Sequence, residues 1–265
     1  MGNNKFVTLG EKVRGFSHEK NKTRCEDRYK IKELDKAVIV AVADGHGSSK
    51  CKYSQEGAQR AVEVFCDIFL KMYKSYDGDL EKLRQCISRN KTEVIPKRIS
   101  KEWNDKVKLM HAKKRKNEDF NFELYGTTLL GMLLTDNFYF ALQLGDGDMI
   151  CVTNQEETDY VLKGEKLLGT ETYSLSSKDS WKNMSTEVHF VENKEEYPKL
   201  FMISTDGYSN SFASEIDFLE SGTGYLELIK NYGENEIKKN LKPWLKEISK
   251  EGCGDDIAVV LIAKS

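Results

Sequence analysis

The chain has 265 residues, of which 32% are charged, and its formal net charge is −2. This near-neutral balance argues against a chain-wide nucleic-acid interface, and the length suits one large domain, residues 1–265, with a sizeable core. No apolar run approaches the roughly 18 residues of a membrane span, so we expect a cytoplasmic protein with no membrane partner. The six cysteines show no metal-ligand spacing, which is typical of reduced thiols.

Apolar runs of strand length recur along the chain. The stronger runs are 37–43, 127–134, 138–144, 149–152, 200–204 and 257–263, and the weaker ones are 6–13, 29–34 and 188–191. Short links, such as those at 135–137 and 145–148, favour antiparallel hairpins between neighbouring runs.

Helical periodicity occurs in three blocks and does not alternate with every strand. The blocks cover 53–73, then 80–111 with an interruption near Pro96, then 213–249 with breaks at 221–224 and Pro243. Strand groups separated by helical blocks predict an α+β fold, with helices covering the faces of antiparallel sheets.

The segment 79–119 is basic, with 13 Lys or Arg residues against 7 Asp or Glu. It could be a docking surface for an acidic or phosphorylated partner. A solvated helical face explains the same pattern, and we favour this second interpretation because charge runs carry little specificity.

Acidic residues stand where the apolar runs begin or end. They are Glu26, Asp27, Asp44, Asp146, Asp206, Asp255 and Asp256. One Asp-Gly pair alone is a turn signal, and we interpret Asp77-Gly78 in this way because no apolar run precedes it. Several acids at strand ends are harder to explain as turns.

Carboxylates that converge repel one another unless they are protonated or matched by cations. The sequence near Asp44, Asp206 and Asp255 offers few Lys or Arg residues, so a hard divalent cation is the economical partner. Mg²⁺ and Mn²⁺ prefer carboxylates, backbone carbonyls and water, and the glycine at Gly45 would let the backbone approach such an ion. Zinc is disfavoured because none of the four histidines is paired at ligand spacing.

The motifs "VADGHG", "YGTTLLGMLL", "LGDGDMI", "ISTDGYSN" and "GDDIAVVLI" occur in this order. In this order they resemble the metal-dependent protein phosphatases of the 2C type, the PPM family. "GFSHEKNKTRCEDRY" is similar to the first motif of that family, and "LLGTETYSLSS" is similar to the flap of its bacterial branch. The resemblance runs from about Phe16 to the end, and five motifs in order are specific where one alone is not.

The resemblance implies two antiparallel sheets sandwiched between helical layers, and two Mn²⁺ or Mg²⁺ ions with a third, weaker one. It implies that Asp44 bridges the two ions, that the Gly45 carbonyl binds one, and that Asp206 and Asp255 complete the other. Asp146 would support the third ion. Glu26 and Asp27 would hold waters around the ions, and Asp256 stands where the family usually has Asn.

The resemblance also implies a catalytic role for His46, which would protonate the leaving alkoxide, although a structural turn histidine is the alternative. Many members of the family grip the substrate phosphate with an arginine four residues before the glutamate. Lys22 occupies that position here and Arg24 lies two residues closer, so either residue could serve. A lysine binds phosphate as a point charge and lacks the bidentate fork of arginine.

We therefore expect Mn²⁺- or Mg²⁺-dependent hydrolysis of phosphoserine and phosphothreonine in protein substrates, with a Ser/Thr kinase as the opposing enzyme. One alternative is a catalytically weak or silent member that binds phosphoproteins through the same cleft. Another is a phosphatase of small phosphorylated metabolites. The polar stretch at about 164–186 suits a mobile flap, although a plain surface loop fits it equally well.

Overall fold

The computed structural model describes residues 6–163 and 172–264. Within them, two five-stranded sheets are formed, and the pairings between neighbouring strands are antiparallel. The first sheet has the order β1 (Phe6–Val13), β10 (Ile257–Lys264), β9 (Leu200–Ser204), β6 (Asp148–Val152) and β7 (Thr158–Leu162). The second has the order β2 (Arg28–Glu33), β3 (Ala37–Ala43), β4 (Leu129–Thr135), β5 (Phe138–Leu144) and β8 (Ser185–Phe190).

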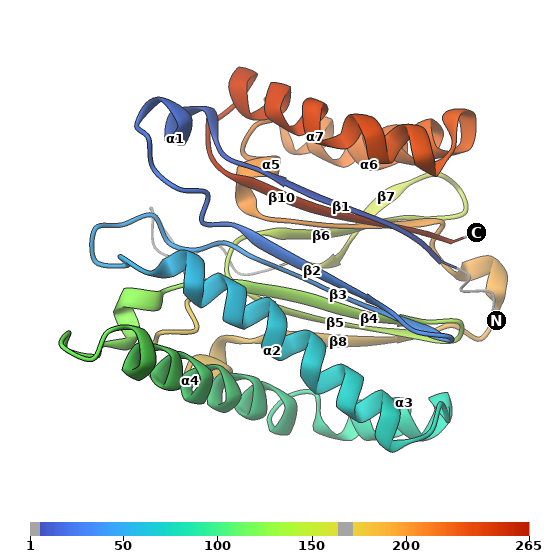
Figure 1. Cartoon of the computed structure of the whole chain (residues 1–265). Coiled ribbons are helices and arrows are strands. Elements are labelled where there is room, and N and C mark those ends of the chain that lie inside the picture. The colour runs from blue at the N-terminus through green and yellow to red at the C-terminus, as the bar shows by residue number, and fades with distance from the viewer. Residues whose placement is uncertain (1–5, 164–171, 265) are drawn as a thin grey trace.

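The two sheets lie face to face between two helical layers (Figure 1). The helices are α1 (Phe16–Lys20), α2 (Ser54–Ser75), α3 (Leu80–Asn90), α4 (Val94–Lys114), α5 (Asp206–Ser209), α6 (Glu215–Tyr232) and α7 (Glu234–Glu251). Three short 3-10 turns are η1 (Phe122–Tyr125), η2 (Ser180–Asn183) and η3 (Lys194–Glu196). In Figure 1, α2, α3 and α4 cover the β2–β8 sheet, and α6 and α7 cover the β1–β7 sheet. The predicted α+β sandwich is confirmed.

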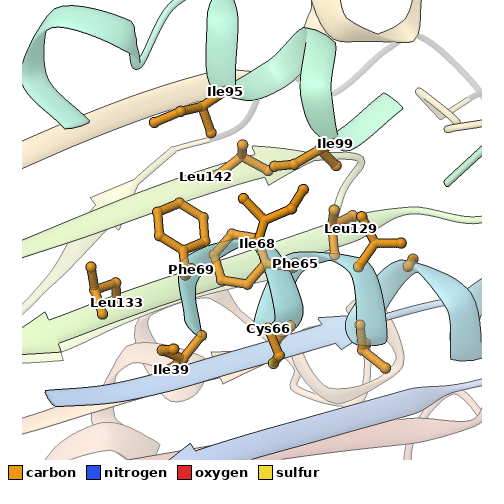
Figure 2. Packing of buried hydrophobic residues seen from close by; sticks show 14 of the residues in the cluster. Ile39, Phe65, Cys66, Ile68, Phe69, Ile95, Ile99, Leu129, Leu133 and Leu142 are labelled. Atoms are coloured by element: carbon orange, nitrogen blue, oxygen red, sulfur yellow. The ribbon is translucent and has the colours of Figure 1, made fainter. Parts of the chain in front are cut away.

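The central strand β3 shows why its sequence is apolar without alternation. Ile39 and Ala41 face the helical layer, where Phe65 of α2 packs, whereas Val38 and Val40 face the space between the sheets. Figure 2 shows the first of these clusters, with side chains of α2 packed between the sheet and α4. Because both faces are buried, each valine or isoleucine side chain of β3 adds about 1.5–3 kcal/mol of hydrophobic stabilisation.

One predicted hairpin is wrong. The link at 145–148 does not pair its flanking strands, because β5 belongs to one sheet and β6 to the other. The chain crosses between the sheets here, and Gly145 has φ 110°, a conformation that glycine adopts without strain. The crossing leaves Asp146 between the two sheets at their ends.

The predicted helix breaks also need correction. Helix α6 runs unbroken through 221–224, where Gly222 lets the helix approach Ile150 and Val152 of β6. The break comes instead at Gly233, with φ 78°. Pro243 lies inside α7 on its exposed face, where the carbonyl that it leaves unpaired can meet water. Pro96 lies in the first turn of α4, which tolerates it.

Within the described residues, no helix has both the length and the apolar character needed to cross a membrane. The basic segment 79–119 forms mainly α3 and α4.

Candidate active site

The antiparallel registers bring the acidic residues to one end of the sandwich, where α1 and α5 lie in Figure 1. Ala43 at the end of β3 pairs with Arg28 at the start of β2, so the next residues, Asp44 and Asp27, become neighbours. Ser204 at the end of β9 pairs with Val259 of β10 and with Asp148 of β6. The positions that follow Ser204 therefore lie beside those that precede β10 and β6.

A cavity of about 750 Å³ opens at this end. Asp44, His46, Asp146 and Asp206 line it together, although they are up to 162 positions apart in the sequence. Its remaining lining residues are Gly47, Ser48, Cys51, Glu123, Thr172, Ser174, Ser176 and Ser177. Three of the expected metal-binding aspartates and the expected catalytic histidine thus share one cavity.

Asp44 is held by Thr127 and Thr128, the two residues that precede β4. Its N–H donates to Thr128 Oγ1 at 2.9 Å, and its carbonyl accepts from Thr127 Oγ1 at 2.7 Å and from Thr128 N at 2.9 Å. Burial raises the pKa of the Asp44 carboxyl well above its usual range, and the nearby Asp27 and Asp206 carboxylates add to this. The position therefore favours either a proton or a cation on Asp44.

Asp27 lies against Asp44, and the two carboxyl groups can share a hydrogen bond only when one of them is protonated. Asp27 is 1% exposed and accepts from Thr205 Oγ1 at 2.6 Å, next to Asp206. Burial first, and then the charge of Asp256, raise the pKa of Asp27. Asp27 therefore links the end of β9 to the end of β3.

Asp206 begins α5, and its carboxylate accepts from Asn210 Nδ2 at 3.0 Å. Burial, followed by the Asp146 and Asp255 carboxylates, raises the pKa of Asp206 to about 7. Asp146 itself keeps a buried oxygen, Oδ1, without a hydrogen-bond partner among the described residues. Both acids offer oxygen atoms that a cation could bind.

Glu26 and Asp256 connect through the main chain. Asp256 is 3% exposed, and one of its oxygens accepts from Gly15 N and the other from Glu26 N, each at 2.7 Å. His18 Nδ1 lies 2.9 Å from the same Asp256 carboxylate. The Glu26 carboxylate accepts from Ser54 Oγ at 2.6 Å, and burial raises the pKa of Glu26, although Ser54 opposes this.

Asp255 is more open than its neighbour, with a side chain that is 51% exposed. Its carboxylate accepts from the Asp256 N–H at 2.7 Å and lies 3.7 Å from His18 Nε2. Asp255 does not line the cavity, but its charge raises the pKa of Asp44 and Asp206. It therefore stands at the rim of the site.

Gly45 is buried and tightly packed. A Cβ at this position would lie 2.8 Å from the carbonyl carbon of Ser54, so a side chain would push α2 away. His46 follows on the cavity wall, and burial lowers its pKa while the Asp146 carboxylate opposes the change.

Lys22 and Arg24 lie in the loop after α1, and both side chains are exposed. Neither is among the described residues that line the cavity. Lys22 has φ 55°, which is uncommon for a residue with a side chain.

The donor chemistry fits a hard divalent cation. Among residues 6–163 and 172–264, no three His, Cys, Asp or Glu side chains form a ready cation site by themselves. Mg²⁺ and Mn²⁺ keep several waters and often use one or two carboxylates, so a shell of three side chains is not required. The unpartnered Asp146 oxygen and the repulsion among Asp44, Asp27 and Asp206 would both be relieved by such an ion.

Several contributors were not found by sequence reasoning. Ser54, Thr127, Thr128, Thr205 and Asn210 hold the acids in place. Asn210 lies only four residues after Asp206, but the other four lie 28 to 178 positions from the acids that they bind, so no local spacing reveals them. The described part of the expected flap, 172–186, contributes Thr172, Ser174, Ser176 and Ser177 to the cavity wall, and residues 164–171 lie outside the described residues.

Comparison with known proteins identifies a family that covers most of the chain. Residues 14–246 match the family model for protein phosphatase 2C. No curated protein sequence is similar enough to the chain to give a match.

Solved structures share the fold at low identity. An S. agalactiae serine/threonine phosphatase matches with TM-score 0.63 at 15% identity, covering 98% of this chain and 100% of that one. The catalytic domain of the serine threonine protein phosphatase PstP, solved in complex with 2 manganese ions, matches with TM-score 0.58 at 14% identity over 97% of each chain. A C. elegans sex determining protein matches with TM-score 0.62 at 17% identity over 98% of this chain, which spans 65% of that one.

Proposed function

The chain belongs to the protein phosphatase 2C family, and we propose that it is a Mn²⁺- or Mg²⁺-dependent phosphatase of phosphoserine and phosphothreonine in proteins. The observation that carries the proposal is the shared cavity of Asp44, His46, Asp146 and Asp206. A kinase that phosphorylates the same protein would be its opposing enzyme.

In this proposal the metal-holding groups are the Asp44, Asp206 and Asp255 carboxylates and the Gly45 carbonyl, with Asp146 on a third, weaker ion. When bound, two such cations make water acidic enough to supply hydroxide near neutral pH and neutralise phosphate oxygens. Glu26 and Asp27 would hold waters around the ions, and Asp256 holds the main chain of Glu26 through its 2.7 Å hydrogen bond. Lys22 or Arg24 draws the substrate phosphate to the mouth of the cavity.

His46 donates a proton to the departing serine or threonine oxygen. Its position on the cavity wall, two residues after Asp44, supports this role. The lowered pKa makes the imidazolium a stronger acid toward an alkoxide, although a smaller fraction of it carries the proton at neutral pH.

The first test is hydrolysis of p-nitrophenyl phosphate with Mn²⁺, with Mg²⁺ and with EDTA, using the wild type and Asp206→Ala. We expect turnover that requires the metal and that falls by about a hundredfold or more in the variant. Folded wild-type protein without turnover in either metal would contradict the proposal and favour the silent, phosphoprotein-binding alternative.

The role of His46 has its own test in His46→Gln. Nitrophenolate leaves without a proton, whereas a serine alkoxide needs one, so kcat should fall more for a phosphoserine peptide than for p-nitrophenyl phosphate, by about 10²-fold. An equal loss on both substrates would assign His46 a structural role. Comparing phosphopeptides with small phosphorylated metabolites in the same assay separates the protein phosphatase from the metabolite phosphatase.

A further inference from the structure

His18 of α1 takes no part in the mechanism proposed above, yet its imidazole lies between two consecutive acids of the candidate active site. Nδ1 is 2.9 Å from Asp256 Oδ1, and Nε2 is 3.7 Å from Asp255 Oδ1. Within the described part of the chain, no other basic side chain forms an ion pair with either acid. A ring between two carboxylates has a donor for at least one of them in every protonation state.

The main chain of α1 is packed against the residues that precede β10. Ser17 N donates to the Gly254 carbonyl at 2.9 Å, and a Cβ at Gly254 would lie 2.3 Å from Ser17 Oγ. A Cβ at Gly15 would lie 2.4 Å from the carbonyl carbon of Asp255. The two segments are in contact at both glycines, so the main chain of His18 has a fixed position relative to Asp255.

Asp256 restricts the rotation of the His18 ring. It is 3% exposed, and its carboxylate holds both ends of the loop that carries α1, because it accepts from Gly15 N and from Glu26 N, each at 2.7 Å. His18 Nδ1 is buried close to this carboxylate, although its N–H is not aligned for a hydrogen bond. The contact keeps Nε2 on the side of Asp255.

Asp255 needs a restraint, because its side chain is 51% exposed and the terminal torsion of an aspartate is broad. Its Oδ1 accepts from the Asp256 N–H at 2.7 Å and faces His18 Nε2, so both contacts act on the same oxygen. The 3.7 Å separation is longer than a direct hydrogen bond, and His18 therefore acts as a close polar neighbour. Oδ2 makes no hydrogen bond with another described residue, which leaves this oxygen for a cation.

We propose that His18 is a positioning residue, which restrains the Asp255 carboxylate and thereby raises the affinity of the site for Mn²⁺ or Mg²⁺. The inference rests on the proposed function, in which Asp255 is one of the metal-holding groups. Loss of a partner that orients a metal ligand typically weakens metal binding by about 10- to 100-fold. Because the contact with Nε2 is longer than a hydrogen bond, we expect the lower end of this range.

Isothermal titration calorimetry of the full chain with Mn²⁺, without substrate, measures this affinity directly. We expect His18→Ala to raise the Kd for Mn²⁺ by about 10-fold, and His18→Gln, whose amide keeps a donor, to raise it by about 3-fold or less. With p-nitrophenyl phosphate as substrate, the Mn²⁺ concentration at half-maximal rate should rise by the same factor in His18→Ala. The kcat at saturating Mn²⁺ should stay within about twofold of the wild type.

A double variant separates this role from a merely structural one. If His18 acts through Asp255, His18→Ala should raise the Kd no further in an Asp255→Asn background, where Asp44 and Asp206 remain to bind Mn²⁺. Effects that add in the double variant would overturn the proposal, and so would an equal Kd for the wild type and His18→Ala.

The matched control is Lys20→Ala on the same short helix, where the Lys20 ammonium is exposed and lies 4.3 Å from the ring centroid of Phe16. Loss of this positive charge can only favour cation binding, so the Kd for Mn²⁺ should not rise. A rise equal to that of His18→Ala would assign the effect to the folding of α1 and overturn the proposal.

Failure of this inference differs from failure of the proposed function. Wild-type protein that binds Mn²⁺ without hydrolysing p-nitrophenyl phosphate would contradict the proposed function and leave the comparison of Kd values in force. Full turnover with an unchanged Kd in His18→Ala would overturn the role of His18 alone.

Discussion

The acidic rim and the basic segment carry opposite charges, and they differ in how many neighbouring groups of the opposite charge surround them. The acidic rim comprises Glu26, Asp27, Asp44, Asp146, Asp206, Asp255 and Asp256. In the basic segment, 79–119, many cations have an acid within one helical turn or on a neighbouring helix. These pairs include Arg84–Glu81, Lys97–Glu93, Arg98–Glu102, Lys101–Asp105, Lys106–Asp67 and Arg115–Glu56. At the rim, the neighbours that raise the pKa of Asp44 are other carboxylates.

The charges of the basic segment are balanced by ion pairs within the fold, whereas no Lys or Arg among the described residues pairs with the acidic rim, whose charges favour binding of a cation. The ion pairs of the basic segment support its interpretation as a solvated helical face. The rim concentrates one sign of charge in and around a cavity, which is unfavourable for folding unless a ligand compensates it.

The largest expected effect comes from neutralising a rim carboxylate with Asp44→Asn. We expect kcat on p-nitrophenyl phosphate to fall by about a hundredfold or more, while the free energy of unfolding in EDTA does not fall, because repulsion with Asp27 and Asp206 is relieved. Asp77→Asn makes the same chemical change at a turn outside the cavity, where Asn also tolerates the positive φ of 49°, and should leave both quantities unchanged. If the free energy of unfolding in EDTA also fell in Asp44→Asn, the lost activity would follow from the fold and Asp44 would be a structural acid.

A smaller effect is expected from breaking the most buried pair of the helical layer. Arg115 makes two hydrogen bonds to Glu56, at 3.0 and 3.1 Å, and lies 3.5 Å from the ring centroid of Tyr53. Arg115→Ala should lower the free energy of unfolding by about 1.5–3 kcal/mol, as measured by urea denaturation, because half-buried Glu56 keeps only Lys114, at 3.3 Å, and loses two hydrogen bonds. Unchanged turnover of p-nitrophenyl phosphate in the same variant would show that Arg115 stabilises the fold and does not act in the candidate active site.

The pH dependence of stability reports the same pair. Burial raises the pKa of Glu56, but Arg115 and Lys114 outweigh this and bring it below 4.5. A lowered folded-state pKa stabilises the protein above the unfolded value and loses this stabilisation as the pH falls from about 4.5 through the folded value. We expect the wild type to lose up to about 1 kcal/mol more than Glu56→Gln across this window, and parallel curves for the two proteins would contradict the assignment.

The smallest effect is expected at an exposed pair of the basic segment. Lys101 lies 3.8 Å from Asp105, with side chains that are 81% and 64% exposed. Lys101→Ala should change the free energy of unfolding by less than about 0.5 kcal/mol. A larger loss would show that the basic segment contains an organised network.

The strands could be predicted where burial makes the sequence apolar. The runs at 37–43, 138–144 and 200–204 coincide with β3, β5 and β9. The edge strand β7 (Thr158–Leu162) was missed because its residues are mostly half-exposed and its short sequence lacks a clear apolar pattern. The link at 145–148 looked like a hairpin because the turn residues do not record whether the next strand joins the same sheet.

The acids of the site could be recognised because each stands next to an apolar run. Their supports could not, because Thr205 meets Asp27 across 178 positions and the contact depends on which strands are neighbours. The contact of His18 with Asp256, at 2.9 Å, depends in the same way on the packing of α1 against the start of β10.

Each of the two sheets supplies an acid to the candidate active site, and this arrangement has a mechanical consequence. Asp44 belongs to one sheet and Asp206 to the other, so any ligand that binds both carboxylates ties the two halves of the sandwich together at one end. The side chains packed between the sheets, such as Val40 and Ile203, set the distance between the Asp44 and Asp206 carboxylates that such a ligand must span. Ligand binding at the acidic rim and local opening of the two sheets are therefore thermodynamically linked. Amide hydrogen exchange at the ends of β3 and β9 should slow when the ligand is bound.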